Sequence, residues 1–344
     1  MKKRLFAALL AVVLVYGSLA GCSGGTDDHS ASTEAAGKGE ASASGSKKIT
    51  LVLSQRDEWL STLDKAAQDA ATAAGYTMTS QDALSDSSKQ IQYVNTAASA
   101  GEKAVLVNLV DPNIAADIVE AAGDMKVIFV NRTPADTNLL NENVVYVGSN
   151  ESTSGYYQGE FLSKYFKEQG KTEIKYILLN GILGQVSTIN RTASVLQALE
   201  DAGITATEAS SPLACNYDRA EAMTKITPLL TGGVKFDCII ANNDSMALGA
   251  IEALENAGMD PSSIPIVGID ATADGVQAVK NGKMAMTVFQ NAVGQGSAAM
   301  EVAINMLNGN ELNEGTGYEM DKENQYTIWV PFEPVTPENV ADYE

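Results

Sequence analysis

Histidine is nearly absent from this chain of 344 residues, in which His29 is the only one. Serine and cysteine nucleophiles are usually activated by a neighbouring base such as histidine, and zinc sites draw on histidine and cysteine. His29 lies in a segment rich in serine, alanine and glycine that has little apolar surface to bury. The sequence therefore leaves Ser–His and Cys–His catalysis without a partner and zinc without its usual ligands.

Positive charge is also scarce, with 23 lysines and arginines against 43 acidic residues and a formal net charge of −20. Proteins that bind nucleic acid need clustered lysine and arginine to contact phosphates, so this composition argues against a nucleic-acid partner. An acidic chain is also repelled by an anionic bilayer, so any attachment to a membrane would need an anchor of another kind.

Cysteine is rare too, and Cys22, Cys215 and Cys238 are the only ones. Three cysteines do not make a disulfide framework. Cys238 lies in an apolar run from 236 to 241, which favours a buried free thiol, and pairing with Cys215 stays open at this point. A glycine-rich phosphate loop is missing as well, because Gly232 and Gly233 stand alone and indicate a turn.

The first residues indicate a targeting signal rather than part of a folded domain. Lys2, Lys3 and Arg4 precede an apolar stretch over 5–20, which is short for a helix that spans a bilayer. The stretch ends in Leu-Ala-Gly-Cys22, which resembles the lipobox of bacterial lipoproteins; an uncleaved anchor is the alternative. We expect a signal peptide over 1–21, lipidation of Cys22, a flexible tether over 22–47 and a location on the outer face of the cell membrane.

From residue 48 onward, short apolar runs alternate with segments of helical periodicity. In the first half we expect strands over 49–54, 76–79, 104–108, 126–131 and 144–148, and helices over 60–74, 87–100 and 113–122. In the second half we expect strands over 173–180, 204–209, 236–241, 264–270, 284–290 and 326–330, and helices over 155–168, 191–202, 219–230, 245–257, 274–281 and 293–307. Such alternation predicts an α/β fold with parallel sheets covered on both faces, arranged as two similar doubly wound lobes. A single doubly wound enzyme domain is the alternative.

Polar side chains follow most of these strands, where open parallel sheets bind ligands. In the first half they include Asp57, Asn108 and the pair Asn131-Arg132. In the second half they are Asn180, Gln185, Ser187, Arg191, Asn243, Asp270 and Gln290. Amides and carboxylates match the dense hydroxyl groups of a sugar, although the same residues commonly cap helices. Trp59 and Tyr217 follow strands as well and could pack against the C–H face of a sugar ring, or serve lobe packing instead.

From about residue 48 to 331 the sequence resembles the galactose/glucose-binding proteins of the ribose/galactose receptor group. The most specific segments are 108–112 (NLVDP), 146–148 (YVG), 240–250 (IANNDSMALGA) and 264–270 (IPIVGID). The resemblance implies a type I periplasmic binding protein fold, in which three chain crossings form a hinge. We place the crossings near 150, near 290 and within 312–324. The N-lobe then comprises 48–150 plus about 291–318, and the C-lobe 151–290 plus about 319–344.

The resemblance also implies roles for individual residues. In the N-lobe, Asp57 would accept a bond from a ring hydroxyl, Trp59 would stack on the sugar, and Asn108 would bind a hydroxyl or the ring oxygen. In the C-lobe, Arg191 would donate to the ring oxygen, Tyr217 would be the second stacking aromatic, Asn243 and Asp270 would bind hydroxyls, and Gln290 would replace an asparagine.

The sequence departs from this family in two places. Gln185 and Ser187 stand where the family has a histidine and an aspartate, which puts the identity of the sugar in doubt. The family's calcium loop is replaced by the short segment 167–172, which has too few carboxylates for a calcium site, so we expect no bound metal and no cofactor.

The function that follows is a monomeric solute-binding lipoprotein, not an enzyme. It would bind a galactose- or glucose-like monosaccharide between its lobes and deliver it to the permease of an ABC transporter. The alternatives are a sensing receptor for a chemoreceptor or sensor kinase, and another ligand such as a pentose, an inositol or a furanose. Glycosidase chemistry by Asp57 and Asp270 is a remote further alternative.

Overall fold

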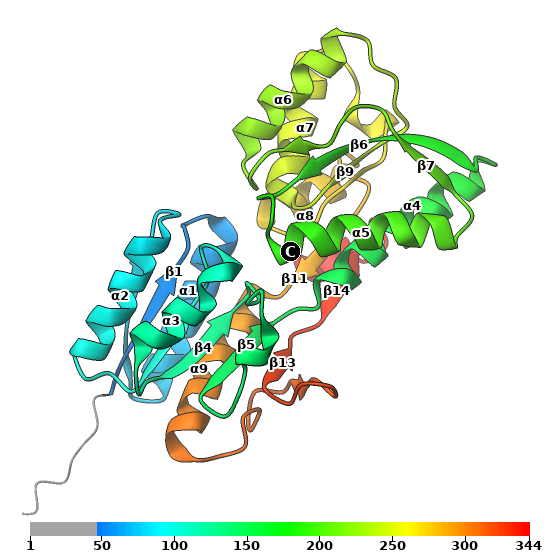
Figure 1. The fold of residues 1–344 in the computed structure, drawn as a ribbon. Helices are drawn as coiled ribbons and strands as arrows, with labels where there is room; N and C mark the ends of the chain where they lie inside the picture. The colour runs from blue at the N-terminus through cyan, green and yellow to red at the C-terminus, as the bar shows by residue number, and fades with distance from the viewer. Residues whose placement is uncertain (1–46) are drawn as a thin grey trace, which may run out of the picture. The chain divides into compact units, whose positions relative to one another are not determined.

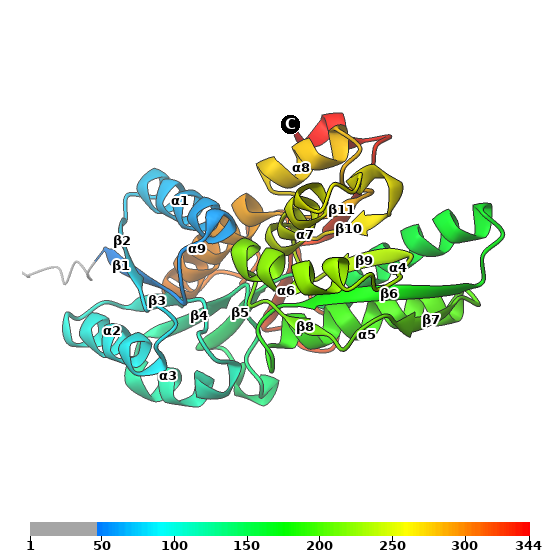
Figure 2. The same cartoon turned by 90° about the horizontal axis from the view of Figure 1, so that it is seen from above.

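The strands form two mainly parallel sheets, each covered by helices on both faces (Figures 1 and 2). The computed structural model describes residues 47–344, which belong to one compact unit. The signal peptide, Cys22 and nearly all of the tether, which the sequence predicts, lie outside the described residues. We name the lobe around the first sheet the N-lobe and the other the C-lobe. The predicted α/β fold class is confirmed.

The N-lobe sheet has the strand order β12-β13-β5-β4-β3-β1-β2. Its strands are β1 (Lys48–Leu53), β2 (Thr77–Asp82), β3 (Ala104–Val107), β4 (Lys126–Val130), β5 (Val144–Gly148), β12 (Glu319–Met320) and β13 (Thr327–Trp329). Its helices are α1 (Glu58–Ala73), α2 (Ser87–Ser99), α3 (Ala115–Ala122) and α9 (Ala292–Asn308), with 3-10 turns η1 (Pro112–Ile114) and η2 (Thr137–Leu139). The late segments α9 and β13, orange and red in Figure 1, pack with the earlier strands: α9 with β4 and β13 with β5.

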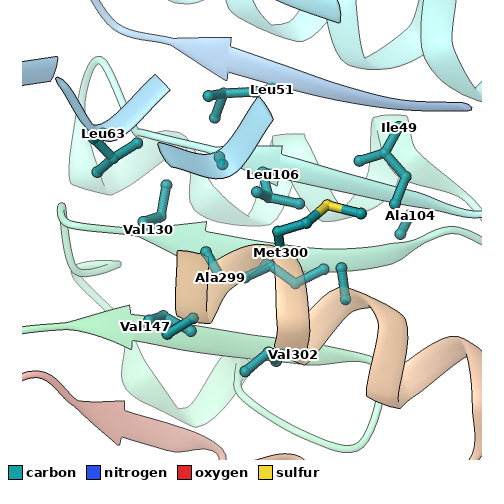
Figure 3. Packing of buried hydrophobic residues seen from close by; sticks show 14 of the residues in the cluster. Ile49, Leu51, Leu63, Ala104, Leu106, Val130, Val147, Ala299, Met300 and Val302 are labelled. Carbon is teal, nitrogen blue, oxygen red and sulfur yellow. The ribbon is translucent and has the colours of Figure 1, made fainter. Parts of the chain in front are cut away.

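Alternation along the strands divides the N-lobe core between the two faces of the sheet. Leu51 of β1 and Leu106 of β3 point to the face covered by α1 and α9, where they meet Leu63 and Met300 (Figure 3). Val52 belongs to the other face, beneath α2 and α3. Nearly every residue of β1 and β3 is therefore buried, as expected for strands inside a doubly covered sheet.

The C-lobe sheet has the order β10-β9-β6-β7, with β8 beside β6 and an antiparallel pair β11–β14. Its strands are β6 (Glu173–Asn180), β7 (Thr205–Glu208), β8 (Leu213–Ala214), β9 (Cys238–Ala241), β10 (Ile266–Val267), β11 (Thr287–Gln290) and β14 (Phe332–Val335). Its helices are α4 (Glu151–Glu168), α5 (Val186–Asp201), α6 (Arg219–Thr231), α7 (Asp244–Asn256) and α8 (Ala273–Lys280), with 3-10 turns η3 (Pro261–Ser263) and η4 (Val340–Tyr343). Single parallel bridges between Val267 and Met286 and between Asp270 and Phe289 connect the pair to the rest of the sheet.

The chain passes between the lobes after β5, after β11, and between β13 and β14. The third crossing corrects the prediction, which put it within 312–324 and assigned 319–344 to the C-lobe. Thr327–Trp329 pairs in parallel with Tyr146–Gly148, so the segment up to Trp329 completes the N-lobe sheet. Only the chain from Phe332 onward belongs to the C-lobe, where β14 pairs with β11.

Both cysteines in the described part of the chain, Cys215 and Cys238, are buried and free, as predicted for Cys238. Burial raises the pKa of the Cys215 thiol to about 11, which keeps it protonated. Among residues 47–344, none of the helices combines the length and apolar character needed to span a bilayer.

Candidate functional site

A small cavity of about 50 Å³ lies where strand ends of both lobes meet. Its lining residues are Asp57, Trp59, Leu60, Asn131, Arg132, Glu151, Ser187, Arg191, Tyr217, Asn243, Asp270 and Gln290. All of the predicted ligand-binding residues except Asn108 and Gln185 are among them. The structure thus brings together side chains that lie more than two hundred positions apart in the sequence.

The N-lobe wall of the cavity is formed at the start of α1. Asp57 is the N-cap of this helix, and its Oδ1 accepts a hydrogen bond from the Leu60 amide at 2.8 Å. Two residues after Asp57, Trp59 Nε1 donates to the carbonyl oxygen of Gln290 at 2.9 Å. The indole is therefore fixed against the second crossing and presents its ring at the cavity wall.

Arg191 on α5 is the charged centre of the C-lobe wall and is only 4% exposed. Its Nε donates to Glu151 Oε2 at 2.6 Å, and its Nη1 donates to the Asn242 carbonyl at 2.7 Å. Its Nη2 lies 3.4 Å from Gln290 Oε1, and Asp270 Oδ1 is 3.9 Å from Nη1. Burial alone would lower the pKa of Arg191, but Glu151, with Tyr217 and Asp270, outweighs it and raises that pKa, so the guanidinium stays charged.

Asn243 and Asp270 follow neighbouring strands of the C-lobe. Asn243 caps α7 through a bond from the Met246 amide to its Oδ1 at 3.0 Å, which leaves its amide nitrogen available. Asp270 adopts a φ of 122°, a conformation that L-residues rarely take and that is common at ligand sites. Burial raises the pKa of Asp270 well above its usual value; Arg191 opposes this, while the nearby carboxylates, of which Asp244 weighs most, add to it.

Tyr217 is held in place from several sides. It has a φ of 62°, and its hydroxyl oxygen lies 2.8 Å from both Ser187 Oγ and Thr188 Oγ1. A Cβ at Gly181 would overlap the Tyr217 ring, so glycine is required for the ring to lie there. Ser187 therefore lines the cavity and also orients the aromatic side chain.

Asn108 and Gln185 do not line the cavity. Asn108 is fully buried, and its side chain accepts from Ser54 Oγ at 2.6 Å and donates to Asn131 Oδ1 at 3.1 Å. Gln185 donates to the Val110 carbonyl of the N-lobe at 3.1 Å. Direct ligand contact by these two residues stays a prediction, and the structure gives both side chains partners within the protein.

Asn131, Arg132 and Glu151 line the cavity although none of them was among the predicted ligand-binding residues. Asn131-Arg132 ends a predicted strand, and the φ of 66° at Asn131 adds a sign of strain that only the structure shows. Burial lowers the pKa of Arg132, while Tyr217 and Asp57 act in the opposite direction. Glu151 begins α4 four residues earlier than predicted, and the need of Arg191 for a buried counter-ion was the only available signal.

The side chains around the cavity supply hydrogen-bonding groups and ring faces. The two arginines, three carboxylates and several amides offer donors and acceptors, and Trp59 and Tyr217 offer ring faces. Gln290 Nε2 is a buried donor without a hydrogen-bond partner among the described residues, and such a group costs free energy unless something binds it. No His, Cys, Asp and Glu cluster within residues 47–344 could hold a metal ion.

Comparison with known proteins places this chain in a family. The model of the periplasmic binding protein domain matches residues 49–311. The chain belongs to the periplasmic binding protein family.

Two curated relatives and one solved structure are similar over most of their length. A putative rhizopine-binding protein of Rhizobium meliloti is 32% identical over 80% of this chain and 84% of that protein. A D-galactose/methyl-galactoside binding periplasmic protein of Haemophilus influenzae is 30% identical over 90% of this chain and 95% of that protein. A solute-binding protein of an ABC transporter from Bacillus halodurans, solved with bound myo-inositol, has 32% identity and a TM-score of 0.74, covering 88% of this chain and 98% of that one.

Proposed function

We propose that this protein binds a monosaccharide or a cyclic polyol of similar size between its lobes and delivers it to an ABC transporter. The observation that carries the proposal is the cavity at the strand ends of both lobes, with charged, amide and aromatic side chains converging on it. A ring that bears several hydroxyl groups uses all three kinds of contact at once. Binding without catalysis agrees with the relatives, which are named as binding proteins.

Two ligand classes have support. A galactose- or glucose-like hexose fits the resemblance of Asp57, Trp59, Arg191, Asn243 and Asp270 to a hexose site and the name of the Haemophilus relative. A cyclitol fits the bound myo-inositol in the Bacillus relative. Gln185 and Ser187 replace the histidine and aspartate of the hexose-binding relatives, so we propose myo-inositol as the first ligand to test and galactose as the second.

Calorimetric titration of the full-length protein with myo-inositol, D-galactose, D-glucose and D-ribose tests the proposal. We expect one-to-one binding of at least one ligand and a rise in melting temperature, because a ligand at a hundred times its dissociation constant adds about 2.7 kcal/mol of stability. Absence of heat and of any thermal shift with the whole panel would overturn sugar and polyol binding.

Substitutions in the cavity test the site itself. Trp59→Ala removes a ring face and Asp270→Ala a buried acceptor, so each should weaken binding by about 1–3 kcal/mol. Asp124→Ala is the matched control, because Asp124 is exposed and lies on a loop of the N-lobe outside the cavity. If both cavity variants bind like the control, the ligand binds elsewhere.

We further propose that the protein is exported and lipid-anchored through Cys22, with residues 22–47 as the tether. The support is the order of features in the sequence: basic residues, an apolar stretch, small residues and a cysteine. Cys22→Ser should move the protein from the membrane fraction to the soluble fraction. Unchanged membrane association of this variant would contradict lipidation.

The alternative to transport is sensing, in which the protein presents the same bound ligand to a chemoreceptor or a sensor kinase. Deletion of the gene separates the two, because loss of ligand uptake supports transport. Normal uptake with lost induction or lost taxis supports sensing.

A further inference from the structure

Gln185 connects the two lobes outside the ligand cavity. It follows β6 in the C-lobe, and its Nε2 donates to the carbonyl oxygen of Val110 in the N-lobe at 3.1 Å. The side chain is only 3% exposed, although the residue lies on a connection between a strand and a helix. The opposite lobe therefore contacts this side chain, while the cavity lining excludes it.

The position of Gln185 makes this contact unusual. It is the N-cap residue of α5, where a polar side chain normally accepts a bond from the first turn of the helix. Asp57, Asn150 and Asn243 act in this way on α1, α4 and α7. The side chain of Gln185 forms no capping bond and instead reaches the other lobe.

The acceptor of this bond lies in a segment whose geometry is fixed. Three consecutive carbonyl groups each accept a bond from a different part of the protein. Gln90 Nε2 donates to Asn108 O at 2.8 Å, Arg132 Nη1 donates to Leu109 O at 2.9 Å, and Gln185 donates to Val110 O. Gln90, which is fully buried, also accepts from the Val110 amide at 2.9 Å.

Arg132 links this segment to the ligand site, because it lines the cavity and holds the Leu109 carbonyl at the same time. The lobes touch in this structure through Gln185 and Val110 and through Trp59 and Gln290, and we call this arrangement the closed state. A contact that exists only when the lobes approach adds to the stability of this state, whichever ligand is bound.

We propose that Gln185 is a positioning residue that holds the lobes in the closed state, like a latch, through its hydrogen bond to the Val110 carbonyl. It does this without contacting the ligand. The inference rests on the proposed function only where it predicts an effect of Gln185 on ligand affinity. Because the latch is independent of ligand identity, its loss should weaken every ligand by one common factor. A residue that touches the ligand would instead affect different ligands to different extents.

The test compares the full-length Gln185→Met and Ile189→Ala variants with the unmodified protein. Methionine keeps the length of the side chain and removes the donor, and Ile189 is an exposed residue of the same helix, 55% accessible. Dissociation constants and dissociation rates for myo-inositol, D-galactose and D-ribose are measured, together with the radius of gyration of the ligand-free protein by small-angle X-ray scattering.

We expect Gln185→Met to raise the dissociation constant by about two- to tenfold, the range of one hydrogen bond, and by the same factor for each ligand that binds. The dissociation rate should rise, the ligand-free radius of gyration should increase, and Ile189→Ala should match the unmodified protein. Factors that differ between ligands, or unchanged affinity together with an unchanged radius, would overturn the latch.

If no ligand of the panel binds, the proposed function fails. The role of Gln185 in holding the lobes together is then tested by the radius of gyration alone. A larger ligand-free radius for Gln185→Met than for Ile189→Ala then supports it, and equal radii overturn it.

Discussion

Arg191 combines two tasks within one side chain. Its guanidinium contacts each of the three crossings: Glu151 begins the helix after the first, Gln290 ends the strand before the second, and the Phe332 ring, 5.9 Å from Cζ, follows the third. The same group lines the ligand cavity. Arg191 therefore links the cavity between the lobes to all three crossings through one side chain.

Glu151→Ala should be among the most destabilising substitutions in the described part of the chain. The ion pair between Glu151 and Arg191 is buried on both sides, with 5% exposure of each side chain. Removing one partner of a buried pair leaves an uncompensated charge, which costs about 3–5 kcal/mol. Urea unfolding measures the loss, and Glu168→Ala, at an exposed end of the same helix, should change the free energy of unfolding by less than about 0.5 kcal/mol. Equal stability of the two variants would refute the role of the ion pair.

Asp244 makes stability depend on pH. Burial raises its pKa to about 7, although Thr287 Oγ1 and the Thr272 amide donate to its carboxylate. In the unfolded chain the same group titrates near about 3.9. Between these values the folded protein binds a proton that the unfolded chain has released. Its free energy of unfolding should therefore rise as pH falls from about 7 towards 4, by at most about 1.4 kcal/mol per pH unit.

Denaturant unfolding at pH 8, 7, 6 and 5 measures this effect. Asp244→Asn, which cannot ionise, should show a flatter profile than the unmodified protein over the same range. The buried carboxyl of Asp270, whose pKa is also raised, should leave a remaining slope of the same sign. Parallel profiles would mean that Asp244 is already ionised in the folded protein.

Among the elements, α1 and α9 form the most extensive helix contact of the N-lobe. A Cβ at Gly296 would overlap the carbonyl oxygen of Leu63 on α1, so glycine allows the two backbones to approach. Gly296→Ala should push the helices apart and destabilise the protein by about 1–3 kcal/mol, despite the better helix propensity of alanine. The melting temperature of Ser297→Ala, one position along the same helix, serves as the comparison and should hardly change. A stabilised Gly296→Ala variant would contradict the close packing.

The sequence predicted elements well where the apolar pattern alone decides them. Strand β6, helix α6 and the buried strands β3 and β4 were predicted within one or two residues of their bounds. Strand β14 was not predicted, because Pro334 lacks the amide hydrogen of a ladder and argues against a central strand; it pairs at an edge instead. The prediction assigned the segment 319–330 to the C-lobe instead of the N-lobe, because apolar alternation does not reveal which sheet a strand joins.

The site was predicted to the extent that its residues follow strands. Asp57, Asn243 and Asp270 come at such positions, and the parallel topology then brings them to the cavity. Arg191 lies further along, within α5 and eleven residues after the end of β6. Glu151 could not be selected, because it is identified only by its contact with Arg191 across the fold. Nothing in the local sequence distinguishes Gln185, which contacts the opposite lobe, from Ser187, which lines the cavity.

For the whole molecule, each lobe depends on the last part of the chain. Helix α9 provides Ala299, Met300 and Val302 to the N-lobe core, and β14 provides Phe332 to the C-lobe core. A chain that ends at Gln290 should therefore unfold without a cooperative transition in thermal denaturation, while a chain that ends at Pro337 should keep one. Cooperative melting of the shorter chain would show that the early residues fold alone.

Because both lobes are completed by late parts of the chain, this order also affects folding during synthesis. Residues 291–344 emerge after the earlier parts of both lobes, and at about 5–20 residues per second their translation takes roughly 3–10 s. During that interval the N-lobe still lacks first α9 and then β13, and the C-lobe still lacks β14. Neither lobe of the nascent polypeptide therefore has a finished core until these residues have been made, which would suit the proposed export through a narrow channel in an unfolded form.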